Sequence, residues 1–324
     1  MRQAAGRSRL LEQGCRWLLD IYRDISPKTA RLRARLEGRN ARVNGVAPEN
    51  IIWIFGSGRS GSTWLRGMME ELDRHHAWEE PMVGRLFGEF HDRAPESDLR
   101  RPDFIMGDAT RKAWMMAIRS FVLDYISYAR PRLGADDYLV VKEPNGSMGA
   151  PLLAEALPES RMILLIRDPR DIVSSQLDGA RRGGWMYKRK ENEDWKRKAL
   201  PDNDPDTFVK NRSQRYLLHA GGATRAYNAH RGPKVLVRYE DLRVDTLGTM
   251  ERIYSTLGLL VDERELARVV EKHSWENIPE EEKGEGKFRR KATPGGWRDD
   301  LTAQQAKIVE EVTAPLLEEF YRSG

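Results

Sequence analysis

Residues 51–65, with the sequence IIWIFGSGRSGSTWL, constrain what this chain can fold into more than any other segment. The short apolar run Ile51–Phe55 predicts a buried strand, which ends at a glycine-rich turn that opens into a helical pattern. Glycines let a backbone curl around an anion. The amides at the N-terminus of the following helix point at that anion, where the helix dipole favours negative charge. The segment therefore predicts a cradle for a phosphate-like group.

The loop departs from the Walker A pattern at its most diagnostic position. Gly56 and Gly61 have the Walker spacing, but Ser62 and Thr63 stand where Lys-Ser/Thr is expected. The cation, Arg59, lies inside the loop instead. We therefore expect the loop to hold a phosphate or sulfate without the usual triphosphate and magnesium chemistry, through its amides, its arginine and its hydroxyls. An ordinary glycine-rich turn with a surface arginine is the alternative.

Short apolar segments alternate with helical periodicity along the rest of the chain. Further strands are predicted at 138–141, 162–166 and 235–237, and helices at 63–72, 112–128, from Pro169 onward, 208–230, 246–257, 263–271 and 302–321. This alternation is typical of a parallel sheet that is covered on both faces. We predict a single α/β domain with a central, mainly parallel sheet flanked by helices. Ligands of such sheets bind beyond the carboxyl ends of the strands.

The net charge of +5 is distributed unevenly. Residues 1–44 hold 11 Lys and Arg against 4 Asp and Glu, whereas the remainder holds 44 against 46. We expect residues 1–47 to form a basic helical arm and 48–324 to form the main domain, in which 276–298 is a mobile lid. The apolar face within residues 7–39 favours a helix docked on the body. Peripheral contact with a membrane or an acidic partner is the alternative.

The composition argues against several classes of protein. The single cysteine, Cys15, cannot form a disulfide framework, and the six histidines lack metal-ligand spacing, so we expect no bound metal. No apolar run approaches the ~20 residues that span a bilayer. The N-terminus lacks the apolar core of a signal peptide. We expect a cytoplasmic protein, with peripheral contact at a membrane left open.

A second cationic motif follows the predicted strand 162–166. Arg167 ends that strand, and Ser175 lies two turns into the next helix, which Asp168 and Pro169 begin as N-cap and first helical residue. The guanidinium and the hydroxyl can both face the mouth above the sheet and hold a second phosphate. The alternative is a strand-end arginine paired with a neighbouring aspartate.

A third cationic run lies near the C-terminus. Arg289, Arg290 and Lys291 precede a Pro-Gly-Gly turn and Trp297. Such a run is usually a solvated loop, but here it can fold back as a lid over an anionic ligand.

Together these motifs resemble those of sulfotransferases that use 3′-phosphoadenosine 5′-phosphosulfate (PAPS). GSGRSGSTWL resembles the 5′-phosphosulfate loop of that family, RDPRDIVSS its 3′-phosphate motif, and RRKATPGGWRDDLT its C-terminal cofactor segment, all in the family's order. The resemblance implies a P-loop-like fold, PAPS as donor, PAP (3′,5′-adenosine bisphosphate) as product, and no metal. It implies that the cofactor is bound by Arg59, Ser60, Gly61, Ser62, Thr63, Trp64, Arg167, Ser175, Trp275, Arg289, Arg290 and Lys291, the tryptophans lying near the adenine.

One departure from the cytosolic members concerns the catalytic base. Their histidine is absent from the aligned segment, which keeps Lys142 but continues Glu143-Pro144. The segment looks instead like that of tyrosylprotein sulfotransferases, which supply a glutamate after the first helix. Glu80 lies 21 residues after Arg59, where that pattern has its catalytic glutamate. The resemblance therefore assigns catalysis to Glu80 as base, with Arg59 and Lys142 stabilising charge. The alternatives are Glu79 and Glu143, then His75 or His76, and a surface acidic pair at a helix end.

The sequence says little about the acceptor. Residues 181–198 hold 8 basic and 3 acidic residues with interleaved aromatics, which suits an anionic glycan or a peptide if the segment is not simply a solvated loop. A small hydroxylated metabolite stays open, as do O- or N-sulfation and the oligomeric state, and no nucleic acid is expected as a partner.

Two rival functions remain. A P-loop kinase or other nucleotide phosphotransferase would explain the loop, although Ser62 replaces the Walker lysine. A non-catalytic module that binds adenosine bisphosphate or nucleic acid would explain the basic segments.

Overall fold

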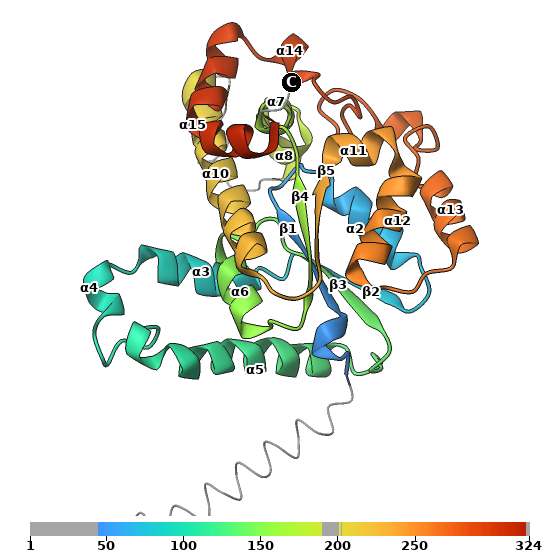
Figure 1. Cartoon of the computed structure of the whole chain (residues 1–324). Helices are drawn as coiled ribbons and strands as arrows, with labels where there is room; N and C mark the ends of the chain where they lie inside the picture. Colours follow the sequence, from blue (N-terminus) through green and yellow to red (C-terminus); the bar gives the residue numbers. More distant parts are fainter. Residues whose placement is uncertain (1–44, 190–200, 202, 322–324) are drawn as a thin grey trace, which may run out of the picture. The chain divides into compact units, whose positions relative to one another are not determined.

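A computed structural model describes residues 45–189, 201 and 203–321 (Figure 1). The expected arm, residues 1–47, lies almost wholly outside the described residues, and so does the stretch 190–198 of the basic segment. The division of the chain at residue 47 and the membrane contact of the arm therefore stay predictions. The described residues from Val46 onward form one compact unit.

Five parallel strands form the centre of this unit (Figure 1). Their order is β2-β3-β1-β4-β5, with bounds His75–Glu79, Tyr138–Lys142, Ile51–Gly56, Arg161–Ile166 and Lys234–Arg238. Every neighbouring pair runs in parallel, so the carboxyl ends of all five strands meet at one edge. The predicted α/β fold with a parallel central sheet is confirmed. The chain winds to opposite sides of β1, and a crevice at such a switch point is where α/β sheets bind ligands.

Helices lie on both faces of the sheet (Figure 1). The longer ones are α2 (Ser62–Glu70), α3 (Val83–Arg93), α5 (Arg111–Ala129), α6 (Ala150–Ala156), α7 (Pro169–Ala180), α10 (Pro205–Ala229), α12 (Thr246–Leu257), α13 (Glu263–Lys272) and α15 (Ala303–Tyr321). Short helical segments are η1 (Pro48–Asn50), α4 (Glu96–Leu99), η2 (Asp108–Thr110), η3 (Ser147–Gly149), α8 (Trp185–Arg189), α11 (Tyr239–Val244), η4 (Glu280–Glu282) and α14 (Trp297–Asp300).

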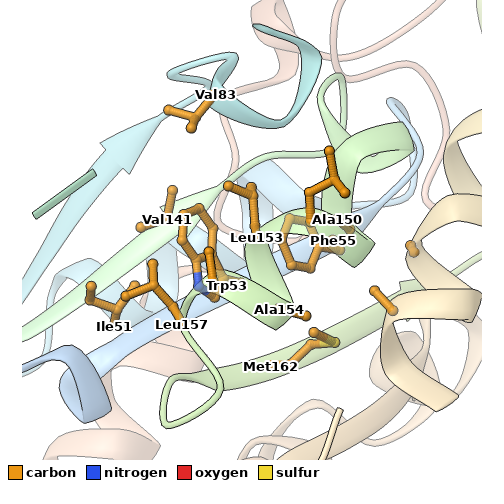
Figure 2. Close-up of a cluster of buried hydrophobic side chains, with 14 of the residues drawn as sticks. Ile51, Trp53, Phe55, Val83, Val141, Ala150, Leu153, Ala154, Leu157 and Met162 are labelled. Carbon is orange, nitrogen blue, oxygen red and sulfur yellow. The ribbon is translucent and has the colours of Figure 1, made fainter. Parts of the chain in front are cut away.

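The central strand β1 is buried along its whole length because both of its faces are covered. Successive side chains of a strand point to opposite faces. Trp53 and Phe55 accordingly stack on one face, with ring centroids 5.4 Å apart, in the cluster that α6 and α10 cover (Figure 2). Ile52 and Ile54 join the opposite cluster beneath α2 and α12. Burial on both faces explains why the sequence reads as a continuous apolar run there.

The strands predicted from apolar runs are confirmed to within one residue at each end, and the long helices to within three. The edge strand β2 was not predicted, and the alternative of a helix end at Glu79 and Glu80 is wrong, because Glu79 ends this strand. Its sequence, HHAWE, holds no β-branched residue and only one strongly apolar side chain, so it lacks a strand's usual pattern.

The expected lid, 276–298, contains the short η4, the first two residues of α14 and one isolated bridge between Lys283 and Arg289. Backbone amides of residues 286–297 donate to side-chain carboxylates of α7, which holds this part of the segment against that helix. Whether the segment moves stays a prediction.

Candidate active site

The loop between β1 and α2 has a backbone that few residues tolerate. Gly61 has a φ of 91°, and a Cβ built on it would lie 2.6 Å from the ring of Tyr239, so both conformation and space require glycine. Arg59 is also left-handed, with a φ of 76°, which costs a non-glycine residue about 1–2 kcal/mol. Ser62 begins α2, and the first amides of a helix have no partner within the helix. The amides at the start of α2 and the strained Arg59 therefore both lie on the cleft beside the loop.

Two arginines from different strand ends meet beside this loop. Arg59 Nε donates to Ser175 Oγ at 3.1 Å, and Arg167 Nη1 donates to the carbonyl oxygen of Arg59 at 3.0 Å. Burial, and next the like charge of Arg167, lowers the pKa of Arg59 to about 10. Arg167 Nε and Ser60 Oγ are buried and have no hydrogen-bond partner in the described part of the chain. Buried cations with unsatisfied polar atoms favour the binding of an anion.

Aromatic rings form a wall next to the two arginines. Trp64 Nε1 donates to the carbonyl oxygen of His273 at 2.8 Å, and its indole lies edge-on to Tyr239, with centroids 6.3 Å apart. The Arg167 guanidinium lies 4.2 Å from the centroid of the Tyr239 ring. Trp275 is partly exposed on the same cleft. The wall offers flat apolar surfaces of the kind on which a purine base stacks.

Two carboxylates of α7 hold the segment 286–297. Asp178 Oδ2 accepts a hydrogen bond from the amide of Gly286 at 3.0 Å. Asp171 accepts from the amides of Gly295 at 2.8 Å and Trp297 at 3.0 Å. Burial raises the pKa of Asp171, against the lowering effect of Arg167 and of these two amides. The same helix therefore supplies Ser175 to the site and anchors the segment that carries the three consecutive cations.

Those three cations line the cleft, and each is paired with a carboxylate in this structure. Arg290 bonds Ser174 Oγ at 3.0 Å and the carboxylate of Asp300, and Lys291 Nζ lies 2.9 Å from Asp300 Oδ1. Arg289 pairs with Glu282. Their charge is thus partly neutralised by Asp300 and Glu282, which the sequence reading did not connect to them.

Glu80 lies at the end of β2 in a hydrogen-bonded network. Lys142 Nζ contacts Glu80 Oε1 at 2.8 Å and Glu79 Oε1 at 2.6 Å, and Asn145 Nδ2 donates to Glu80 Oε2 at 2.8 Å. Burial raises the pKa of Glu80, but the hydrogen bond and charge of Lys142 and the hydrogen bond of Asn145 outweigh it, so the net shift is downward. Glu80 also has a left-handed backbone, with a φ of 41°. Glu80 is therefore an ionised carboxylate held in a fixed orientation.

The other base candidates have different surroundings. Glu143 is fully buried and accepts from the amides of Met82 and Gly84, each at 3.0 Å, at the start of α3. Burial, partly offset by these amides, raises the pKa of Glu143 to about 7. His75 and His76 begin β2, at the opposite edge of the sheet from the loop. The structure therefore keeps Glu79 and Glu80 at the cleft and separates Glu143, His75 and His76 from it.

One cleft of about 1200 Å³ collects almost every residue that the sequence singled out. Its lining includes Arg59, Gly61, Ser62, Thr63, Trp64, Glu80, Lys142, Arg167, Ser175, Trp275, Arg289, Arg290 and Lys291. Ser60 lies buried beneath the loop instead. Lysines and arginines outnumber carboxylates among the described lining residues, so the cleft favours anionic ligands.

Two negative findings concern the described residues. These residues include no group of three or more His, Cys, Asp or Glu side chains arranged to hold a metal ion. Among their helices, none combines the length and apolarity that crossing a bilayer needs.

The fold and the cleft define an α/β protein with a cationic site at the carboxyl ends of its strands, and sequence comparison identifies the family. The profile of the Sulfotransferase family matches residues 52–263, so the chain belongs to that family. It is a sulfotransferase by this membership, which sets aside the kinase and the non-catalytic alternatives. No curated protein sequence matches the chain.

Solved structures of sulfotransferases share the fold. Sulfotransferase STF9 from Mycobacterium avium is 14% identical, with a TM-score of 0.51 over 86% of this chain and 78% of that one. Mouse sulfotransferase SULT7A1, complexed with PAP, is 14% identical, with a TM-score of 0.50 over 86% of each chain.

Several residues that line the cleft were not predicted from the sequence to belong to the site. Tyr239 directly follows β5, so the rule that strand ends carry the site could have found it. Arg66 and Asn145 lie a few residues beyond recognised motifs. Arg212 and Arg215 line the cleft from the middle of α10, far from any motif, and no local signal marks them.

Proposed function

We propose that this cleft binds PAPS and transfers its sulfuryl group to a hydroxyl or amine of an acceptor. The loop amides with Arg59, Ser62 and Thr63 suit the 5′-phosphosulfate. Arg167 and Ser175, with the run 289–291, suit the 3′-phosphate, and the aromatic wall suits the adenine. When bound, PAPS supplies an activated sulfuryl group.

The residues present fit such a donor. Arg59 and Arg167 are packed together without a carboxylate bound to either guanidinium at hydrogen-bond distance among the described residues, and Arg167 Nε is unsatisfied. A group with several negative charges would satisfy both arginines at once. The family membership and a fold shared with a PAP complex support the same donor.

Glu80 acts as the general base in this proposal. Lys142 and Asn145 hold one oxygen each, and the lowered pKa keeps the carboxylate ionised at neutral pH. A base positioned in this way contributes roughly 10²–10⁴-fold to a rate. Glu80 removes the proton from the acceptor hydroxyl or amine as that group attacks.

Arg59 and Lys142 stabilise the charge that develops during transfer. Lys142 is buried to 4% exposure, and its ammonium group contacts both glutamates at the end of β2. Fixed cations in a partly buried site act on developing charge without having to reorganise. The acceptor is a glycan, a peptide or a small hydroxylated metabolite.

The observation that carries this proposal is the shared cleft: the loop with Arg59 and the network of Glu80 with Lys142 line one cavity. The test is a calorimetric titration with PAP in the presence of EDTA, with ATP plus magnesium as comparison. We expect micromolar binding of PAP and weak binding of ATP. Tight binding of ATP with no binding of PAP would overturn the proposed donor.

A further inference from the structure

Arginines extend from the catalytic network toward the side of the cleft that the donor motifs do not use. Arg212 and Arg215 lie on α10, and both line the main cleft together with Glu80 and Asn145. A second hollow of about 560 Å³ has Asn145, Arg212 and Arg215 in its lining as well. These residues therefore mark the place where the cleft continues past Glu80. The volume of the main cleft alone exceeds the ~300–1,000 Å³ of a typical single-ligand pocket.

The charge of Arg212 is not balanced by the residues around it. Arg212 is partly buried, and its guanidinium lies 4.7 Å from the ring centroid of Phe208. No carboxylate forms an ion pair with Arg212 or Arg215 within the residues that the structure describes. Burial, and next the charge of Arg215, lowers the pKa of Arg212 to about 10. Elsewhere in the cleft, the lid arginines each have a carboxylate partner.

The acidic side chains that line this hollow already have partners. Glu89 on α3 bonds Arg85 at 2.7 Å and Arg93 at 2.6 Å. Glu89 acts on Arg215 only through its charge and forms no ion pair with it. Four arginines, Arg85, Arg93, Arg212 and Arg215, thus line the hollow with two described carboxylates, Glu89 and Asp204, and Asp204 accepts the amide of Thr207 at 3.0 Å. The charges around the hollow are therefore unbalanced toward cations, which attracts an anion from solution.

We propose that Arg212 and Arg215 bind an anionic group of the acceptor, a carboxylate, sulfate or phosphate ester near the hydroxyl or amine that reaches Glu80. This inference rests on the proposed function, and it narrows the acceptor to an anionic class. Arginine forks suit all three oxyanions because they donate paired hydrogen bonds.

The test uses the protein saturated with PAP, so that the donor phosphate sites are filled. Inorganic sulfate is then titrated by calorimetry at constant ionic strength, into the wild type, Arg212→Gln and Arg215→Gln. Arg225→Gln is the matched control, since Arg225 is exposed on the same helix and does not line the cleft. We expect each cleft variant to weaken sulfate binding about 10-fold or more, as loss of a charge-assisted hydrogen bond does, and the control to leave it unchanged.

Parallel titrations with acetate and with methyl phosphate rank the carboxylate and phosphate chemistries against sulfate. Equal sulfate affinity in the wild type and both cleft variants, or no sulfate binding to the saturated wild type, would overturn this inference. Arg215 is exposed, so Arg215→Gln keeps the test valid if Arg212→Gln fails to fold. Failure of PAP to bind in the first step would instead reject the proposed function.

Discussion

The two ends of the cleft are built in different ways. The proposed donor end, defined here as residues 58–64, 167, 175 and 289–291, combines the segments that follow β1 and β4 with the C-terminal segment. Arg59 and Arg167 bond hydroxyl and backbone groups, whereas residues 289–291 pair with carboxylates. The acceptor end, defined as Glu80, Lys142, Asn145, Arg212 and Arg215, combines an edge strand, a strand end and the middle of a long helix. The donor end thus relies on the backbone conformation at two strand ends, whereas the acceptor end relies on side chains from elements that are far apart in the sequence.

The largest effect is expected from a substitution that removes the proposed base from the acceptor end and leaves the donor end unchanged. Glu80→Gln should lower kcat roughly 10²–10⁴-fold while PAP affinity stays near normal, because the carboxylate takes the proton but does not contact the donor. Release of PAP from PAPS, measured with an acceptor found by screening anionic hydroxylated compounds, gives kcat.

Glu79→Gln is the matched control, since Glu79 contacts the same Lys142 ammonium group. It should retain most of the activity. Similar losses in the two variants would mean that the pair supports Lys142 and that neither glutamate is the specific base.

The complementary substitution removes a cation from the donor end and should weaken the binding of PAP. Arg167→Ala should reduce PAP affinity about 10–100-fold, the usual cost of losing hydrogen bonds to a charged group. Calorimetry measures this directly, with the exposed Arg181→Ala as control. An unchanged affinity would remove Arg167 from the 3′-phosphate site.

The pH dependence of kcat/KM distinguishes the candidate bases. Because hydrogen bonds outweigh burial and lower the pKa of Glu80, it stays ionised as the pH falls, and the rate should be nearly constant from pH 8 to 5.5. A histidine base with a pKa near 6.5 would lose about 10-fold over that range. Glu143, with a pKa of about 7, would lose more. Circular dichroism and PAP titration at each pH exclude unfolding and donor loss as causes.

The smallest expected effect concerns the anchor between α7 and the C-terminal segment. Asp171→Asn keeps the shape but leaves only one oxygen for the amides of Gly295 and Trp297, so we expect PAP affinity to fall by about 3–10-fold. Asp124→Asn, on an exposed part of α5, serves as control. If Asp171→Asn binds PAP like the wild type, the segment does not contribute to the donor site.

The sequence predicted the donor end better than the acceptor end for a physical reason. Motifs at the ends of buried strands can be recognised in the sequence. The continuous apolar run predicts the strand, and the position where the run stops predicts where the strand ends. Arg59 and Arg167 were recognisable in this way. Asp300 as the partner of Lys291 was not, because the contact depends on how the chain folds back after the Pro-Gly-Gly turn.

At the acceptor end, local patterns carried less information. The periodicity of 208–230 predicted a helix, but it could not say that Arg212 and Arg215 look into a cleft rather than into solvent. Glu80 was placed by resemblance and not by secondary structure, since the strand before it was missed. Glu143 was an alternative base in the sequence, and only the structure shows that it accepts the amides of Met82 and Gly84 at the start of α3.

The left-handed backbones of Arg59 and Glu80 have a consequence for how this enzyme can evolve. Of the four non-glycine residues with positive φ in the described chain, these two are the ones assigned a role in transfer. Glycine would adopt either conformation at less cost, by about 1–2 kcal/mol at each position. Glycine would also remove the hydrogen bonds that these two side chains make, so relief of the strain and loss of the site's contacts come together at both positions.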